Sequence, residues 1–307
     1  MIVVVCPGQG SQTPGFLAPW LELDGMRERL EKYSDAAGVD VIEHGVHSDA
    51  ALIRDTSIAQ PLIVAASLTT WHALTDLVPK GAIGGVAGHS VGELAALPAA
   101  GVLTDDAAMR LVGVRGRAMA HAAAFEMTGM SAIVGGVEAE VIACIDDLAL
   151  TAANRNGAGQ IVAAGGLGQL DRLQKHPPAG ARVIPLPVAG AFHTVYMHSA
   201  VDKLTHAAAD VDVADPQLTL WTNHDGSVVT TGREAIDLLV GQVASPVRWD
   251  LCMESFAAHA VTGIVELAPA GTLVGLAKRA LKGVPTVAVK TPDDLQKAVA
   301  LITGGHA

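Results

Sequence analysis

Cysteine and basic residues are both scarce in this chain. Its 307 residues include only three cysteines, which lie far apart in apolar surroundings at Cys6, Cys144 and Cys252. This usage excludes a disulfide framework and a zinc framework, and it predicts reduced thiols in a cytoplasmic protein. Lysine and arginine number 20 against 31 acidic residues, which gives a net charge of −11. A chain with this balance is not expected to bind nucleic acid.

Long apolar runs, repeats and linkers are missing as well. No apolar segment approaches the length of a membrane-spanning helix, so no membrane partner is expected. The first segment, Met1–Cys6, has no basic stretch before its apolar residues and is predicted to be a buried strand rather than a signal peptide. Half of the residues are hydrophobic, and a folded chain of this length buries on the order of three-quarters of its surface. The composition predicts a globular protein of one large or two smaller domains.

Short apolar segments alternate with longer helical segments along the chain. Strands are expected at Ile2–Cys6, Val261–Leu267 and Thr286–Val289, and helices at Pro61–Leu77 and Thr272–Leu281. This alternation predicts an α/β fold with a parallel sheet. Pro61 suits the first turn of its helix.

Residues 129–187 are interpreted as a small unit of their own. The expected elements are the strands Met130–Gly135, Thr151–Asn154, Gln160–Ala164 and Arg182–Leu186, and the helices Glu138–Leu148 and Leu167–Lys175. Their β-α-β-β-α-β order is that of a split βαβ, ferredoxin-like unit. Because α/β segments precede and follow it, the unit would be inserted into a larger domain formed by residues 1–128 and 188–307. A catalytic cleft is expected at the junction.

A serine stands between two glycines in the sequence Gly-His-Ser-Val-Gly at residues 88–92. This spacing is typical of a nucleophile elbow, in which Ser90 occupies a strained turn between a strand and a helix. Only glycine leaves room for the backbone two residues to either side of the serine. The chain contains 33 glycines, so a Gly-x-Ser-x-Gly match can also arise by chance. An ordinary tight turn is therefore the alternative. Pro98 is expected to kink the helix that follows, or to shift its end.

The loop Pro7–Gln12 directly follows the first expected strand. Its glycines partly match a dinucleotide-binding fingerprint, but Thr13 stands where that fingerprint requires glycine or alanine. The loop is instead predicted to aim the N–H of Gln9 at the same point as the N–H of Val91. Two such donors would form an oxyanion hole.

His193 and Arg115 are the candidate partners of the serine. His193 follows the inserted unit among small and apolar residues, and a neutral imidazole there could accept the proton of Ser90. A hydrogen-bonded structural histidine is the alternative. Arg115 lies in the expected helix Ala107–Ala124, where an arginine is usually solvated. If it turned towards the cleft, its guanidinium would bind a substrate carboxylate in a bidentate manner. No metal site is expected, since the histidines lack metal-binding spacing.

Taken together, these motifs resemble those of the malonyl-CoA:acyl carrier protein transacylases, discrete acyltransferases of fatty-acid or polyketide synthesis. The resemblance covers essentially the whole chain and is carried by Pro7–Gln12, Gly88–Glu93, Arg115-Gly116, Gly129-Met130, Ala153–Asn156, Gln160–Val162 and Phe192-His193. It implies a large α/β-hydrolase-like domain that carries a ferredoxin-like insertion.

The resemblance also implies a role for individual residues. Ser90 would be the nucleophile, His193 the base and Arg115 the group that binds the malonyl carboxylate. Gln9 and Val91 would supply the oxyanion-hole amides, and the main-chain carbonyl of Gln242 would orient the histidine. Asn156 would be a polar contact in the pocket. The bulk of Phe192 would leave little room for a methyl branch on the acyl group.

The implied reaction is ping-pong transfer of malonyl from malonyl-CoA, a substrate, to the phosphopantetheine thiol of an acyl carrier protein. No cofactor is implied, and a monomer is expected. The carrier protein would dock near Lys278, Arg279 and Lys282. One alternative is a serine esterase or thioesterase, whose histidine would need a carboxylate such as Asp146, Asp147 or Asp171. Another is a noncatalytic acyl-binding subunit.

Overall fold

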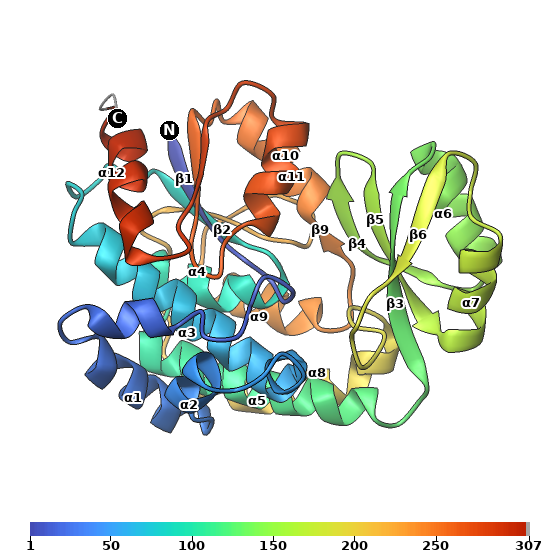
Figure 1. The fold of residues 1–307 in the computed structure, drawn as a ribbon, viewed down its shortest axis with the longest axis horizontal. Coiled ribbons are helices and arrows are strands. Elements are labelled where there is room, and N and C mark those ends of the chain that lie inside the picture. The colour runs from blue at the N-terminus through green and yellow to red at the C-terminus, as the bar shows by residue number, and fades with distance from the viewer. Residues whose placement is uncertain (305–307) are drawn as a thin grey trace.

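Two β-sheets organise the chain in the computed structural model, which describes residues 1–304 (Figure 1). The larger sheet has six strands in the order β11-β10-β1-β2-β7-β8. These strands are β1 (Ile2–Cys6), β2 (Gly85–Gly88), β7 (Thr219–Trp221), β8 (Val228–Val229), β10 (Gly263–Glu266) and β11 (Thr286–Ala288). All neighbouring pairs are parallel except β7 and β8, which are antiparallel.

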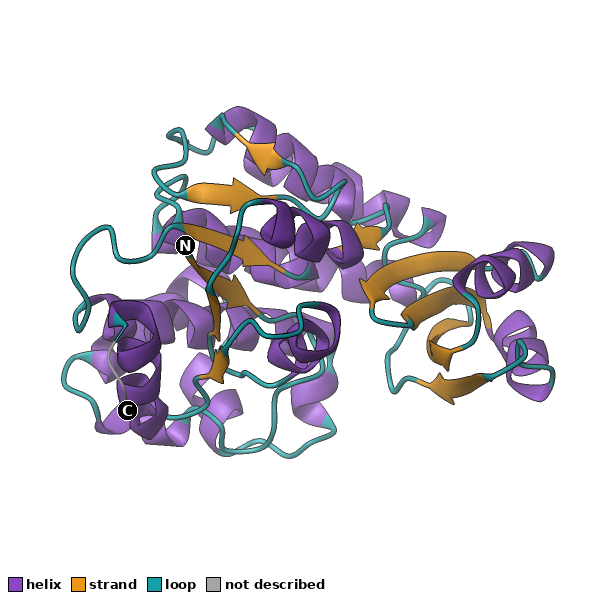
Figure 2. Cartoon of the chain, turned by 90° about the horizontal axis from the view of Figure 1, so that it is seen from above, coloured by secondary structure: helices purple, strands orange, loops and turns teal. Residues whose placement is uncertain are grey.

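Helices cover both faces of the larger sheet (Figures 1 and 2). They are α1 (Met26–Ala37), α2 (Val41–Val46), α3 (Thr56–Thr75), α4 (Glu93–Ala99), α5 (Asp105–Ala123), α8 (His198–Ala208), α9 (Gly232–Gln242), α10 (Trp249–Ala258), α11 (Thr272–Ala280) and α12 (Leu295–Thr303). Short 3₁₀ segments connect them at η1 (Ala18–Glu22), η2 (Leu52–Arg54), η3 (Ser90–Gly92), η4 (Val195–Met197) and η5 (Pro292–Asp294).

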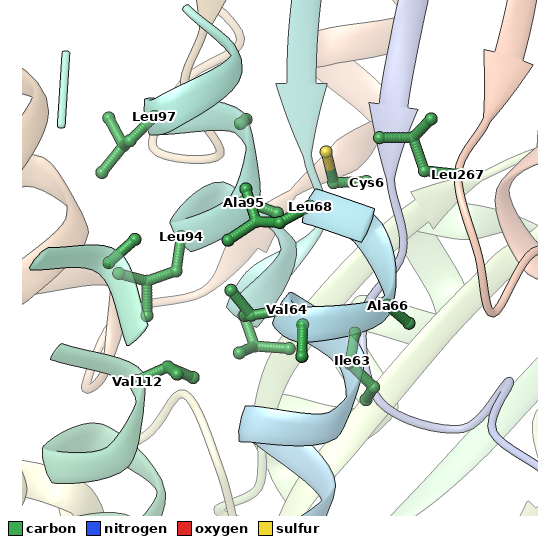
Figure 3. Packing of buried hydrophobic residues seen from close by; sticks show 14 of the residues in the cluster. Cys6, Ile63, Val64, Ala66, Leu68, Leu94, Ala95, Leu97, Val112 and Leu267 are labelled. Carbon is green, nitrogen blue, oxygen red and sulfur yellow. The ribbon is translucent and has the colours of Figure 1, made fainter. Parts of the chain in front are cut away.

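The central strand β1 explains why both faces are covered. All five of its residues are buried, and successive side chains point to opposite faces of a strand. Val4 and Cys6 belong to the main core with α3, α4 and α5, whereas Val3 and Val5 belong to a second core with α10 and α11. Val64 of α3 and Leu94 of α4 are both part of this main core (Figure 3). A continuous apolar strand of this kind is stable only between two helical layers.

The smaller sheet is largely antiparallel, with strand order β6-β3-β5-β4-β9. Its strands are β3 (Thr128–Gly135), β4 (Thr151–Gly157), β5 (Gln160–Gly166), β6 (Ala181–Pro185) and β9 (Val247–Arg248). Helices α6 (Glu138–Asp147) and α7 (Leu167–Lys175) pack on one face, where Ile133, Ile145 and Leu173 form a separate core. β9 comes from later in the chain and pairs in parallel with β4, so it joins the smaller sheet to the rest of the protein (Figure 1).

The expected elements of residues 129–187 are all present, with bounds within three residues of those predicted. The architecture is therefore a mixed α/β fold with one largely parallel and one largely antiparallel sheet. The boundaries of an inserted domain at residues 129–187 stay a prediction. Within residues 1–304, no helix combines the length and the apolar character that crossing a membrane requires.

Two prolines, Pro61 and Pro98, lie inside helices. The prediction that Pro61 begins its helix is wrong, because α3 begins five residues earlier at Thr56. The carboxylate of Asp55 accepts the N–H of Ser57 and caps the helix there, which leaves Pro61 inside α3. Pro98 lies in the last turn of α4, and that helix ends at Ala99.

Candidate active site

A cavity of about 210 Å³ lies where the two sheets meet. The larger part of the fold contributes Ser90, His193 and Arg115 to its lining, and the smaller sheet contributes side chains from β3, β4 and β5. Gln9, Val91, Asn156 and Phe192 also line this cavity. The structure therefore brings together the site residues predicted from sequence, with Gln242 in contact with them from just outside the lining.

Ser90 occupies the strained turn that its motif predicts. The residue begins η3, between β2 and α4, and its backbone φ of 53° lies in the left-handed region. A Cβ atom on Gly88 would lie 2.0 Å from the carbonyl carbon of Gly92, and one on Gly92 would lie 2.2 Å from the oxygen of Cys6. Neither position accepts a side chain, so both glycines are required by close backbone contacts.

His193 contacts the serine through one ring nitrogen and a backbone carbonyl through the other. Its Nε2 lies 2.7 Å from Ser90 Oγ, and its Nδ1 lies 2.9 Å from the main-chain oxygen of Gln242. Because a carbonyl only accepts, Nδ1 carries the proton and Nε2 is left to accept the serine hydroxyl. Burial, together with the charge of Arg115, lowers the pKa of His193 to about 3. The imidazole is therefore neutral throughout the physiological range.

Arg115 turns towards the cavity rather than towards solvent. The residue is 1% exposed, and its Nη2 donates to Gln242 Oε1 at 2.9 Å and to Ser90 Oγ at 3.4 Å. Its Nη1 donates to Gln60 Oε1 at 2.6 Å. Burial lowers the pKa of Arg115 to about 10, so the guanidinium remains a cation at neutral pH.

The partners of this guanidinium are neutral side chains. In the part of the chain that the structure describes, no carboxylate lies within 4.0 Å of Arg115, and its Nε has no hydrogen-bond partner. A buried cation usually has an anionic partner. The arrangement therefore suits a carboxylate that arrives with a ligand.

The loop after β1 is held in place beside the serine. Gln9 donates from its side chain to the main-chain oxygen of Arg54, and Ser11 Oγ lies 2.7 Å from Thr272 Oγ1 at the start of α11. Gln9 and Val91 line the same cavity as Ser90. Convergence of their N–H groups on one oxyanion stays a prediction.

Asn156 connects the smaller sheet to the elbow. Its Oδ1 lies 2.9 Å from Nε2 of His89, the residue before the nucleophile, and its Nδ2 donates to Gln160 Oε1. The hydrogen bond between Asn156 and His89 crosses from β4 to the end of β2. Asn156 is thus one of the contacts that hold the two sides of the cavity together.

Sequence reasoning missed three residues that support the site. Asn223 accepts the N–H of Ser90 at Oδ1 and donates to the oxygen of Gly88, so it holds the backbone of the elbow. Gln60 binds Arg115, and Glu93 accepts hydrogen bonds from Asn223 and Gln242. Glu93 stands one position after the elbow motif, but an isolated asparagine or glutamine gives no signal in a single sequence.

Other candidates lie away from the cavity. Asp146, Asp147 and Asp171 are exposed on α6 and α7, and Asp171 pairs with Lys175. None of them contacts His193, whose Nδ1 is bound to Gln242, so the structure does not supply the carboxylate that an esterase would need. Lys278 and Arg279 are exposed in the last turn of α11, and Lys282 follows that helix.

Comparison with protein families matches residues 3–299 to the acyl transferase domain. The chain belongs to the acyl transferase family. It is 51% identical over 300 residues to the malonyl CoA-acyl carrier protein transacylase of Mycobacterium tuberculosis, which covers 97% of this chain and 99% of that relative. It is 33% identical to the Escherichia coli protein of the same name over 304 residues, covering 97% and 98% of the two chains.

Solved structures of acyl transferases have the same overall fold as this chain. The crystal structure of MCAT from Mycobacterium tuberculosis superposes with a TM-score of 0.95 at 50% identity, covering 97% of this chain and 99% of that one. A type II PKS acyl carrier protein has been solved in complex with its malonyl-transacylase, and that structure gives a TM-score of 0.91 at 30% identity, covering 97% and 98%. The family resemblance predicted from the sequence motifs is confirmed.

Proposed function

We propose that this chain transfers a malonyl group from malonyl-CoA to the phosphopantetheine thiol of an acyl carrier protein. The observation that carries the proposal is that Arg115 is buried beside the hydrogen-bonded pair Ser90 and His193, with no carboxylate of residues 1–304 within 4.0 Å of it. The names of the relatives point to the same donor and acceptor.

In the first half-reaction, Ser90 Oγ attacks the thioester carbonyl of malonyl-CoA. His193 Nε2 lies within hydrogen-bonding distance of that hydroxyl and takes its proton as the new bond forms. The carbonyl of Gln242 stabilises the imidazolium by accepting from Nδ1. The N–H groups of Gln9 and Val91 would hold the oxyanion. As the C–S bond breaks, His193 returns the proton to the CoA thiolate and a malonyl-serine ester remains.

In the second half-reaction, the thiol of the carrier protein attacks the malonyl-serine ester and Ser90 becomes the leaving group. The phosphopantetheine thiol gives its proton to His193 Nε2, and its sulfur attacks the ester carbonyl of malonyl-Ser90. The ester bond then breaks, and the proton moves from His193 to Ser90 Oγ. The serine is restored, and the malonyl group leaves on the carrier protein. No cofactor enters either step, and CoA is a substrate and product only.

Selectivity for malonyl is assigned to two residues. The guanidinium of Arg115 would receive the free carboxylate in a charge-assisted contact. Phe192, which is buried and lines the cavity, would restrict branching next to the carbonyl. A free carboxylate and an unbranched chain together describe malonyl.

The finer description of the fold belongs to the same proposal. We assign residues 1–128 and 188–307 to an α/β-hydrolase-like domain, of which residues 305–307 lie outside the described part of the chain, and residues 129–187 to a ferredoxin-like insertion. The β-α-β-β-α-β order and the strand order β6-β3-β5-β4 support this assignment. A monomeric cytoplasmic protein, with the carrier docking near Lys278, Arg279 and Lys282, completes the proposal.

The test is intact-protein mass after brief incubation with malonyl-CoA, acetyl-CoA or methylmalonyl-CoA in separate reactions. We expect malonyl to be the favoured adduct, carried by Ser90 and discharged when carrier protein is added. Rapid release of free malonate without carrier protein would indicate a thioesterase instead. No adduct with any of the three thioesters would indicate an acyl-binding subunit.

A further inference from the structure

Glu93 is a buried carboxylate that has no part in the chemistry proposed above. It is the first residue of α4, three positions after Ser90, and it is 6% exposed. It does not line the cavity that holds the nucleophile. Removing a carboxylate from water is costly, so the burial of Glu93 must be offset by the contacts that it makes.

Both oxygens of Glu93 are used as acceptors. Oε1 accepts the main-chain N–H of Asn223 at 2.6 Å, and Oε2 accepts the Nε2 of Gln242 at 2.6 Å. An ionised carboxylate offers two accepting oxygens, whereas an amide of the same shape offers one. Glutamine at this position would therefore leave either Asn223 or Gln242 facing an NH₂ group.

The contact with Glu93 determines how the amide of Gln242 is oriented. A carboxylate accepts only, so the amide nitrogen of Gln242 must face Glu93 and the amide oxygen must face the other way. That oxygen accepts from Arg115 Nη2 at 2.9 Å. The main-chain oxygen of Gln242 meanwhile accepts from His193. Gln242 thus links Glu93 to both the arginine and the histidine.

The same contacts place a negative charge one amide away from a buried positive charge. A direct pair between Glu93 and Arg115 would occupy the guanidinium with an internal carboxylate. Gln242 stands between the two and contacts each of them. The charge of Glu93 partly offsets the cost of burying Arg115, and the guanidinium N–H groups that Gln60, Gln242 and Ser90 do not occupy remain for a carboxylate that enters the cavity.

We propose that Glu93 is a positioning residue that orients the Gln242 amide and supplies the buried counter-charge of Arg115, which keeps the guanidinium ready for the malonyl carboxylate. This role rests on the proposed function and adds a residue to it. Burial raises the pKa of Glu93 to about 7, and the contact with Asn223 and the charge of Arg115 act in the opposite direction. Assays at pH 8 therefore address mainly the ionised carboxylate.

The experiment compares rates of Ser90 acylation by malonyl-CoA and by acetyl-CoA at pH 8 in wild type and Glu93→Gln. We expect the malonyl-to-acetyl ratio of kcat/KM to fall about tenfold, since a buried hydrogen bond to a charged group is perturbed. The loss should appear in the KM for malonyl-CoA. A residue with a merely structural role would lower both rates by one factor, and an unchanged ratio would therefore overturn the proposal.

Glu266→Gln is the matched control. Glu266 is also a fully buried carboxylate that accepts main-chain N–H groups, but its partners are Gly271, Leu273 and Val274 at the start of α11. Because Leu273 lines the cavity, this variant should lower thermal stability and both thioester rates by a common factor, while the malonyl-to-acetyl ratio stays within about twofold of wild type, since Glu266 does not contact Gln242 or Arg115. An equal fall in the ratio for Glu266→Gln would count against a specific role of Glu93.

A second variant covers the case in which Glu93→Gln does not fold. Glu93→Asp keeps the charge and both accepting oxygens on a shorter side chain, so its ratio should lie between those of wild type and Glu93→Gln. A folded Glu93→Asp protein in which the malonyl and acetyl rates fall by one common factor would overturn the proposal. Failure of the wild-type chain to acquire malonyl would overturn the proposed function and this role with it. If the wild-type chain acquires malonyl but the Glu93 variants keep its malonyl-to-acetyl ratio, only the role of Glu93 is overturned.

Discussion

The imidazole Nδ1 of His193 lies 2.9 Å from the main-chain oxygen of Gln242, where a serine triad would hold a carboxylate. A carbonyl fixes the same tautomer without adding a negative charge. Among the neighbouring charges, that of Arg115 lowers the pKa of His193 most, because a nearby cation disfavours protonation of the imidazole. Nε2 is thereby left unprotonated and able to accept the hydrogen bond of Ser90 Oγ.

The first prediction concerns the pH dependence of acylation. Because the pKa of His193 is lowered to about 3, the neutral base persists as the pH falls well below the ordinary histidine range. With acetyl-CoA, which has no carboxylate for the Arg115 site that Glu93 supports, the single-turnover rate of Ser90 acylation should be flat from pH 8 to about pH 5 and decline only in more acidic solution. Stopped-flow or quenched-flow measurements across this range would check it. A kinetic pKa near that of free histidine would contradict the assigned environment.

The second prediction concerns the nucleophile. Ser90→Ala should acquire no malonyl label and should remain folded, because the smaller residue adds no contact at the elbow. Ser199→Ala, at an exposed serine, is the control and should be labelled like wild type. Intact-protein mass after denaturation is the measurement. Stable malonyl label on the Ser90→Ala protein would move the nucleophile elsewhere.

The third prediction separates malonyl transfer from general serine chemistry. Arg115→Ala should lower the preference for malonyl over acetyl thioester by roughly 10- to 150-fold, the equivalent of a charge-assisted hydrogen bond of about 1.5 to 3 kcal/mol. Arg115→Lys should recover little, because an ammonium lacks the planar fork. Comparison of kcat/KM for the two thioesters is the measurement.

Arg110→Ala is the control for Arg115. This residue lies on the same helix but is exposed and pairs with Asp106. Its substitution should leave both rates near wild type. If Arg115→Ala instead reduced both thioester rates by one factor, Arg115 would have a structural role.

The fourth prediction concerns stability and uses two glycines as a pair. Gly88→Ala should lower the free energy of unfolding by about 1 to 3 kcal/mol or more, because its Cβ would meet the backbone of Gly92. Gly275→Ala, within α11, should raise it by about 0.5 to 1 kcal/mol, since a Cβ there meets nothing within 4 Å and alanine favours a helix. Urea unfolding followed by circular dichroism would measure both. Equal destabilisation by the two substitutions would refute the close-contact explanation.

The fifth prediction concerns the carrier protein. Reversing the charges of Lys278, Arg279 and Lys282 should raise the KM for an acidic carrier and weaken its salt dependence, while kinetics with malonyl-CoA stay unchanged. Lys203→Glu, an exposed reversal on α8, is the control. If the KM for carrier protein were unaltered in the triple variant, Lys278 and Arg279 would only stabilise the C-terminal end of α11 through its helix dipole.

Local features of the sequence determined much of this protein. The alternating apolar segments predicted the strands and helices, and the bounds of α7 agree with those expected for Leu167–Lys175. The elbow was predictable because its requirements are local: Gly88 and Gly92 face backbone within a few residues or in the neighbouring strand. The start of α3 was missed, since the cap at Asp55 competes with the helix-starting preference of Pro61.

Tertiary structure alone decided how the site is supported. Gln242 contacts His193, Arg115 and Glu93, which stand 49, 127 and 149 positions away in the chain. Periodicity shows which face of an element is buried, but it does not show which distant side chain that face will meet. Hydrogen-bond partners depend on distances set by the packing of whole elements. The sequence therefore pointed to Ser90, His193 and Arg115 as the candidate reacting groups, and the fold placed Glu93, Gln60 and Asn223 in contact with them or with their neighbours.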